Sequence, residues 1–288
     1  MMKYIDPVFR PPAEAESLIF QVAYGCPHNT CRFCGMYKGV TYRLRPQDEV
    51  LHEIAAAGRT YPETTRIFLA DGDVMALPFD RLCRYLDAIL AAFPRMARIS
   101  CYANGSAIQN KTDVELQALR ARKLATLYMG LESGSQIILD LFSKHESVEA
   151  MIDAVLRAQR FGLRCSVMIL LGLGGKTLHQ EHIAQTCAAL NRMQPKLLSA
   201  LRLIVLPQLP LPTAYEPVTE YEAVAELRAI LAGLDLQHTV FRANHTSNPL
   251  PLSGRLPADK SILLAQLDAE LAANHLDRNG AGPTPFFL

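Results

Sequence analysis

The sequence predicts an α/β fold built on a parallel β-sheet, and two observations carry that prediction. Apolar runs rich in β-branched and aromatic residues recur along the first 206 residues, and segments with helical periodicity separate them. With 288 residues and 50% hydrophobic content, the chain is also long enough to bury a full core. Regular strand–helix alternation suits either a doubly wound sheet or a barrel, and periodicity does not choose between them.

The expected strands are uninterrupted apolar runs, as in sheets that are buried on both faces. They span residues 17–24, 65–70, 97–102, 125–131, 163–171 and 197–206. Helical periodicity predicts the helices between them, the first of which begins with a proline and ends with a glycine. These helices span residues 46–58, 78–92, 112–122, 146–161 and 177–193. After about Pro207 a proline-rich stretch intervenes, and further helices are expected at 217–232 and 257–274.

Charge and terminal composition limit the classes of partner. Lys and Arg total 29 against 28 Asp and Glu, and basic tracts are missing, so a small molecule is favoured over nucleic acid. The opening MMKYIDPVFRPP lacks the apolar stretch of a signal peptide, and no long apolar run follows. We therefore expect a cytoplasmic protein without membrane association.

The loop after the first strand, residues 25–35, contains Cys26, Cys31 and Cys34 at C-x4-C-x2-C spacing. Soft thiolates select zinc, copper(I) or an iron–sulfur cluster. A structural zinc site needs a fourth ligand, usually from a second C-x2-C or a His pair, and neither follows in the sequence. His28, within the loop, could be that ligand. A three-cysteine cubane instead leaves one iron open, which suits binding and activating a substrate. In parallel α/β folds and barrels, active sites also lie in the loops at the C-terminal ends of strands, which is where this loop is expected.

With this loop the sequence resembles the radical S-adenosylmethionine (radical SAM) superfamily over about residues 15–206. The four residues between its first two cysteines are a minority spacing there, and the nearest branch is that of oxygen-independent coproporphyrinogen oxidase. The resemblance implies a partial TIM barrel, (β/α)6, over 17–210, with an N-terminal extension at 1–16. It also implies a small C-terminal extension at 211–288 that covers the barrel. Phe33, before the last cysteine, would pack near the adenine.

Further cosubstrate contacts are implied at the strand ends. The second strand ends in Asp71-Gly72-Asp73, which taken alone is an ordinary turn but which the family places against the methionine ammonium. The carboxylates or carbonyls can accept hydrogen bonds, and glycine permits close backbone approach. The contacts implied after the third and fourth strands are, in order, Asn104 and Glu132 with Ser133. In the family, backbone of the fifth strand borders the adenine, which here implies the backbone around Met168.

The other cysteines and histidines are expected to be structural. Four cysteines are scattered, so we predict small buried side chains and no second cluster for Cys83, Cys101, Cys165 and Cys187. His179 and His182 lie three residues apart, which is compatible with a metal, yet no further ligand accompanies them in sequence. We therefore expect both histidines on the surface.

The polar stretch at 241–248 contains Arg242, His245 and Asn248, which we name as candidate catalytic or substrate-contacting residues because loops often carry function.

The function implied by the resemblance is reductive cleavage of S-adenosylmethionine at a [4Fe–4S] cluster. The 5′-deoxyadenosyl radical formed would act on an unidentified substrate, and an external donor such as flavodoxin or ferredoxin would supply the electron. Such a cluster is oxygen-sensitive. The low net charge favours a small-molecule substrate over RNA modification. A zinc-stabilised binding module without catalysis is the alternative from a different class.

Overall fold

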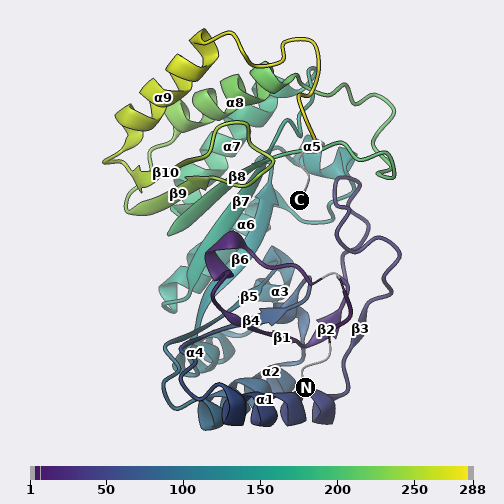
Figure 1. Cartoon of the computed structure of the whole chain (residues 1–288), viewed down its shortest axis with the longest axis vertical. Helices are drawn as coiled ribbons and strands as arrows, with labels where there is room; N and C mark the ends of the chain where they lie inside the picture. Colours follow the sequence, from purple (N-terminus) through teal and green to yellow (C-terminus); the bar gives the residue numbers. More distant parts are fainter. Residues whose placement is uncertain (1–3, 7, 285–288) are drawn as a thin grey trace. The chain divides into compact units, whose positions relative to one another are not determined.

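The structure is a computed structural model that describes residues 4–6 and 8–284. The fold is α/β, as predicted, with an eight-stranded sheet of order β1-β4-β5-β6-β7-β8-β9-β10 that is mostly parallel (Figure 1). Among the described residues, β1 and β10 at the two ends of this order are not paired with each other, so the sheet is open, consistent with the predicted partial barrel. The chain divides into two compact units, which are described separately below.

The first unit contains the described parts of residues 1–29, 36–129 and 154–165. Its strands are β1 (Leu18–Gln21), β2 (Ala23–Tyr24), β3 (Arg43–Leu44), β4 (Arg66–Ala70), β5 (Arg98–Tyr102) and most of β6 (Leu124–Glu132). Its helices are η1 (Pro12–Glu14), α1 (Gln47–Thr60), η2 (Val74–Ala76), α2 (Phe79–Ala92), α3 (Gly105–Gln109), α4 (Asp113–Ala121) and the end of α6 (Val148–Arg160). Helices α1 and α2 lie side by side (Figure 1).

Local sequence explains this unit's elements. Four consecutive residues of β4, Ile67 to Ala70, are fully buried, which is why the strand is an uninterrupted apolar run. Phe68 of β4 pairs with Ile19 of β1 and with Ser100 of β5, in parallel register. Helix α4 begins at a capping box, in which the side chain of Thr112 and that of a glutamate three residues later each accept from the other's backbone N–H.

The second unit contains residues 30–35, 130–153 and the described part of 166–288. Its strands are the end of β6, most of β7 (Arg164–Leu171), β8 (Leu197–Arg202), β9 (Thr239–Ala243) and β10 (Leu252–Leu256). Its helices are α5 (Gln136–Leu141), the start of α6, α7 (His179–Met193), α8 (Glu220–Gly233) and α9 (Lys260–Ala272). Strand β9 runs parallel to β8, β10 returns antiparallel to β9, and α8 packs against both α7 and α9.

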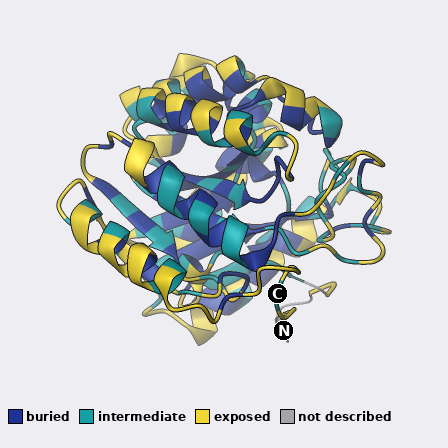
Figure 2. Ribbon diagram, turned by 90° about the horizontal axis from the view of Figure 1, so that it is seen from above, coloured by how far each residue is buried: buried dark blue, intermediate teal, exposed yellow. Residues whose placement is uncertain are grey.

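Burial follows the helical period in both units. The helices carry exposed residues along one face and buried residues along the other (Figure 2). All seven helices expected from the sequence are present, with ends within three residues of the predicted ones. The short helices η1, η2, α3 and α5 and the strands β3, β9 and β10 were not predicted. Among the described residues, no helix combines the length and hydropathy needed to cross a bilayer.

Candidate active site

The cysteine loop begins directly after β2. Gly25 turns the chain with a φ of 74°, a conformation that favours glycine. The backbone N–H of His28 then points at Cys26 Sγ, with an N–S distance of 3.4 Å. A backbone donor of this kind stabilises thiolate charge, which a metal ligand requires.

The cysteines fall into two environments. Cys26, Cys31 and Cys34 are half-buried, whereas the scattered four are buried, as predicted. Burial raises the pKa of the Cys165 thiol to about 12 and that of the Cys187 thiol to about 11. Because such thiols stay protonated at neutral pH, the loop cysteines are the better metal ligands.

The Asp71-Gly72-Asp73 turn lies against the first cysteine. The Gly72 N–H donates to the Gly25 carbonyl at 3.2 Å. A Cβ added at Gly72 would lie 2.5 Å from Cys26 Cβ and 2.8 Å from Cys26 Cα. At Gly72 the turn therefore approaches the backbone of the cysteine loop within the first unit.

The Asp71 carboxylate is buried and accepts hydrogen bonds from two protein side chains. Its carboxylate accepts from Gln21 Nε2 at 2.6 Å and from the Tyr37 hydroxyl at 3.1 Å. Burial raises the pKa of Asp71 to about 6, although these bonds oppose the shift. With both carboxylate oxygens engaged, the backbone carbonyl is the acceptor that this residue offers to a ligand.

Asp73 differs from Asp71 because one of its oxygens has no partner. Its Oδ2 lies 3.1 Å from His28 Nε2, and its side chain is fully buried. Its Oδ1 is buried and accepts no hydrogen bond among the described residues. A buried acceptor without a donor is costly, so the site suits a ligand that brings one. His28, the alternative zinc ligand, directs Nε2 at this aspartate.

Asn104 lies just after β5, and Met168 lies within β7. Asn104 is the N-cap of α3, where its carbonyl accepts from Ile108 N at 3.1 Å and its side chain makes no capping bond. Met168 lies on β7 opposite Ser199 of β8. Both are half-buried, so both keep accessible surface.

The second half of the cysteine loop packs within the second unit. Arg32 N donates to the Phe142 carbonyl at 2.8 Å, and the Phe33 and Phe142 rings lie 6.1 Å apart. The Arg32 guanidinium donates to the carbonyls of Pro210 and Leu211. The proline-rich segment therefore lies over this part of the loop.

Glu132, the last residue of β6, has a φ of 64° and a buried side chain. Burial raises the pKa of its carboxyl, and Lys144, with Nζ 3.8 Å from Oε1, opposes the shift. The carboxylate folds back over Gly130, whose missing Cβ would lie 2.8 Å from Glu132 Cδ. A glycine two residues before the carboxylate is thus a requirement of this conformation.

Ser133 is fully buried and bonded within the protein. Its Oγ lies 2.8 Å from His182 Nδ1 and accepts from Ser135 N at 3.1 Å. The surface assignment of the two histidines was wrong. His182 is fully buried, and His179 Nδ1 lies 2.8 Å from Glu226 Oε2. The reason is a buried carboxylate on α8, a helix that sequence reasoning did not connect to α7.

The C-terminal candidates lie along β9 and the turn after it. Asn248 Nδ2 donates to the carbonyls of Ala200 and Ala243, tying the turn to β8 and β9. His245 Nδ1 lies 2.9 Å from Ser247 Oγ, and burial lowers the pKa of its imidazole. Arg242 is half-buried and opposite Ser199.

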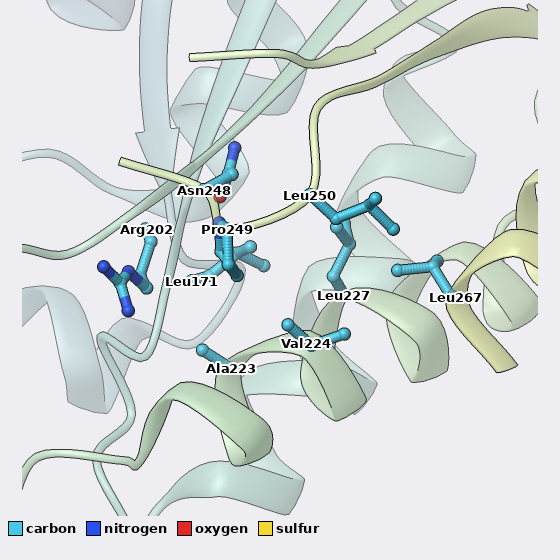
Figure 3. Close-up of a pocket in the computed structure, with 9 residues that line it drawn as sticks. All are labelled: Leu171, Arg202, Ala223, Val224, Leu227, Asn248, Pro249, Leu250 and Leu267. Atoms are coloured by element: carbon cyan, nitrogen blue, oxygen red, sulfur yellow. The ribbon is translucent and has the colours of Figure 1, made fainter. Parts of the chain in front are cut away.

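Asn248 and Arg202 border a narrow cavity otherwise lined mainly by apolar side chains (Figure 3). The Arg202 guanidinium donates to the carbonyls of Ser247, Ala281 and Pro283. Both polar residues therefore bind backbone of the C-terminal segment.

The family described as the radical SAM superfamily matches residues 20–187, which is more than half of the chain. The chain belongs to the radical SAM superfamily. It is therefore an enzyme of a class whose cofactors are a [4Fe–4S] cluster and S-adenosylmethionine.

Several solved structures share this fold. Coproporphyrinogen III oxidase (HemN) from Escherichia coli is 17% identical, with a TM-score of 0.55 over 89% of this chain and 52% of that one. Methylornithine synthase (PylB) is 13% identical, with a TM-score of 0.56 over 88% of this chain and 81% of that one. The maturase HydG from Carboxydothermus hydrogenoformans is 19% identical, with a TM-score of 0.51 over 87% and 56%.

This radical SAM chain spans about half the length of the E. coli enzyme. No curated protein matches it. At these identities the structural likeness establishes the fold.

Proposed function

We propose that Cys26, Cys31 and Cys34 hold the [4Fe–4S] cluster and that the enzyme uses it on a small-molecule substrate. When bound, the cluster supplies an electron for reductive cleavage of S-adenosylmethionine to methionine and a 5′-deoxyadenosyl radical. The observation that carries the proposal is the separation of the cysteines into three half-buried loop thiols and four buried ones. Three thiolates leave one iron open to the cosubstrate.

Two features of the first unit fit the cluster and S-adenosylmethionine. The Gly72 turn touches Cys26 so closely that only a hydrogen fits between them, which brings the Asp73 side of the turn next to the first thiolate. The Asp73 Oδ1 has no donor among the described residues. The ammonium of the methionine moiety would supply that donor, and a charge-assisted bond is worth about 1.5–3 kcal/mol.

The remaining cosubstrate contacts are proposed at the other strand ends. Glu132 offers a buried carboxylate for the ribose hydroxyls, and Asn104 offers a side-chain amide that its helix does not use. Phe33 and Met168 would pack near the adenine. Ser133 would act by shaping the chain next to Glu132, because its own hydroxyl is bonded internally.

The substrate and the reductant are proposed from charge and chemistry. A net charge of +1 without basic tracts favours a small molecule over RNA. Arg242 and His245 are the candidates for contacting it. A low-potential protein such as flavodoxin or ferredoxin would deliver the electron. Four scattered free thiols and an oxygen-sensitive cluster suit the reducing cytoplasm.

Anaerobic reconstitution tests the proposal directly. The enzyme should bind about four irons per chain and form 5′-deoxyadenosine from S-adenosylmethionine under a strong reductant. A metabolite screen that follows deuterium transfer into 5′-deoxyadenosine would then identify the substrate. A colourless protein with one tightly held zinc would refute the cluster, and deuterium transfer only from RNA would refute the small-molecule assignment.

A further inference from the structure

One face of α7 holds the segment that follows Glu132. The Ser133 Oγ, the Gly134 N–H and the Ser135 Oγ each bond to a different α7 side chain, with distances of 2.8, 3.0 and 3.1 Å. The partners are, in the same order, His182 Nδ1, Thr186 Oγ1 and Glu181 Oε1. Three consecutive residues are thus fixed by one helix.

The contact extends to the backbone at Gly134. A Cβ there would lie 2.6 Å from Thr186 Cα, so the segment lies directly on the helix. Because no side chain separates them, a displacement of α7 must displace the segment as well. The conformation of Glu132, immediately before it, depends on the same support.

A carboxylate of α8 lies behind His182. The His182 Nε2 is 3.4 Å from Glu226 Oε1, and both side chains are fully buried. The Ser133 hydroxyl, the imidazole and the carboxylate therefore form one buried row from the end of β6 to α8. Glu226 lies beyond residues 20–187, so the family match does not include it.

Glu226 also supports the loop after β7. Its Oε1 accepts from Gly172 N at 2.7 Å, and its Oε2 lies 2.8 Å from His179 Nδ1. Burial alone would raise the pKa of Glu226, but the two histidines and the Gly172 N–H lower it to about 2. An ionised carboxylate only accepts hydrogen bonds, and Glu226 lies within ion-pair distance of His182 Nε2.

We propose that Glu226 and His182 are positioning residues for S-adenosylmethionine. Without touching it, they fix the chain on both sides of its binding site, at Ser133 after β6 and at Gly172 after β7. The inference rests on the proposed function, and it makes α8 of the C-terminal extension a required part of the cosubstrate site.

A purely structural role would predict a different energetic pattern. Replacing a buried ion pair with apolar groups is often neutral or stabilising, so the pair is weak evidence for stability. Its bonds instead converge on the two segments that border the proposed site. Replacing Glu226 or His182 should therefore weaken cosubstrate affinity. Breaking another buried ion pair should weaken it less, even where the melting temperature falls by the same amount.

The test is a double-mutant cycle on S-adenosylmethionine affinity, measured by calorimetric titration of the reconstituted enzyme. Glu226→Gln keeps the volume and removes the charge, and Ser133→Ala removes the far end of the row. We expect each single substitution to lower S-adenosylmethionine affinity, by about tenfold for Glu226→Gln. The double variant should bind S-adenosylmethionine as tightly as the single variant of lower affinity. Iron content should stay at the wild-type level.

The matched control is Glu53→Gln. Glu53 is a buried carboxylate that accepts from Arg45 at 2.8 and 2.9 Å within the first unit. The Glu53→Gln substitution should lower the melting temperature and leave S-adenosylmethionine affinity within about twofold of the wild-type value. If Glu226→Gln does not fold, His182→Gln replaces it in the same cycle.

Three outcomes would overturn the inference: unchanged affinity in the Glu226 or His182 variant, independent effects that multiply in the double variant, or an equal loss in the Glu53 control. A wild-type enzyme that assembles its cluster but neither binds nor cleaves S-adenosylmethionine would instead refute the proposed function. The two failures are thus told apart by the wild-type measurement.

Discussion

Replacing Gly72 with alanine should impair cluster assembly with little change elsewhere. The added Cβ would lie 2.5 Å from Cys26 Cβ, 2.8 Å from Cys26 Cα and 3.0 Å from the Gly25 carbonyl oxygen. Carbon atoms in contact normally lie about 3.5–4.0 Å apart, so the Gly72 turn and the cysteine loop must separate by about 1 Å. Metal sites tolerate deviations of about 0.2 Å in ligand distance, so such a shift moves the first thiolate out of range.

The cost to folding should be moderate. Overpacking of this kind typically costs about 1–3 kcal/mol, which a chain of this size can absorb. Iron bound after anaerobic reconstitution should therefore fall to roughly half of the wild-type value or less while the variant remains folded. Iron analysis, visible absorbance and a melting curve measure these quantities on one preparation.

Gly39→Ala provides the control, because Gly39 follows the same loop with a φ of 80° but has no atom within 4 Å of an added Cβ. Its left-handed backbone alone should cost about 1–2 kcal/mol. The control should thus lose similar stability and keep its iron. Full iron content in Gly72→Ala, or equal iron loss in both variants, would refute the steric argument.

Three further predictions concern ligands, affinity and pH. Cys26→Ala should abolish cluster assembly, whereas Cys165→Ala should leave iron content unchanged, since its thiol is buried; half the iron lost in the latter would indicate a second cluster. Asp73→Asn should weaken S-adenosylmethionine binding about tenfold or more at normal iron content, and a changed melting temperature with unchanged affinity would contradict this. Because the folded pKa of Glu226 lies at about 2 against 4.5 unfolded, its contribution of about 3 kcal/mol is present above pH 4.5 and is lost as pH falls toward 2. Urea unfolding across this range should show a steeper loss in the wild type than in Glu226→Gln.

The fold was predictable where a strand is buried on both faces. The run that became β4 has no polar interruption after Arg66, so its length and type are evident from sequence. Strands β9 and β10 each contain an arginine and have partly exposed residues, and their short runs lack that signal. Pairing with β8 and with each other stabilises them, which is tertiary information.

Site residues could be proposed from the sequence where they are close to one another along the chain. The cysteine spacing and the Asp71-Gly72-Asp73 turn are local patterns with a local physical meaning. The bond from Gln21 to Asp71 spans 50 residues, and that between His182 and Ser133 spans 49, so neither partner could be chosen from sequence. The three-residue spacing of His179 and His182 led to a surface prediction, and only the structure identifies Glu226 as the carboxylate near both.

Asp73 and Glu132 illustrate how the structure separates residues that the sequence treats alike. Both are buried carboxylates at strand ends, and both were expected to hold the cosubstrate. Glu132 already has a cation, since Lys144 lies 3.8 Å away, whereas the Asp73 Oδ1 accepts no bond among the described residues. A cationic ligand group therefore gains more at Asp73, while neutral hydroxyls can bind Glu132 without displacing Lys144. This asymmetry supports placing the ammonium at Asp73 and the ribose at Glu132.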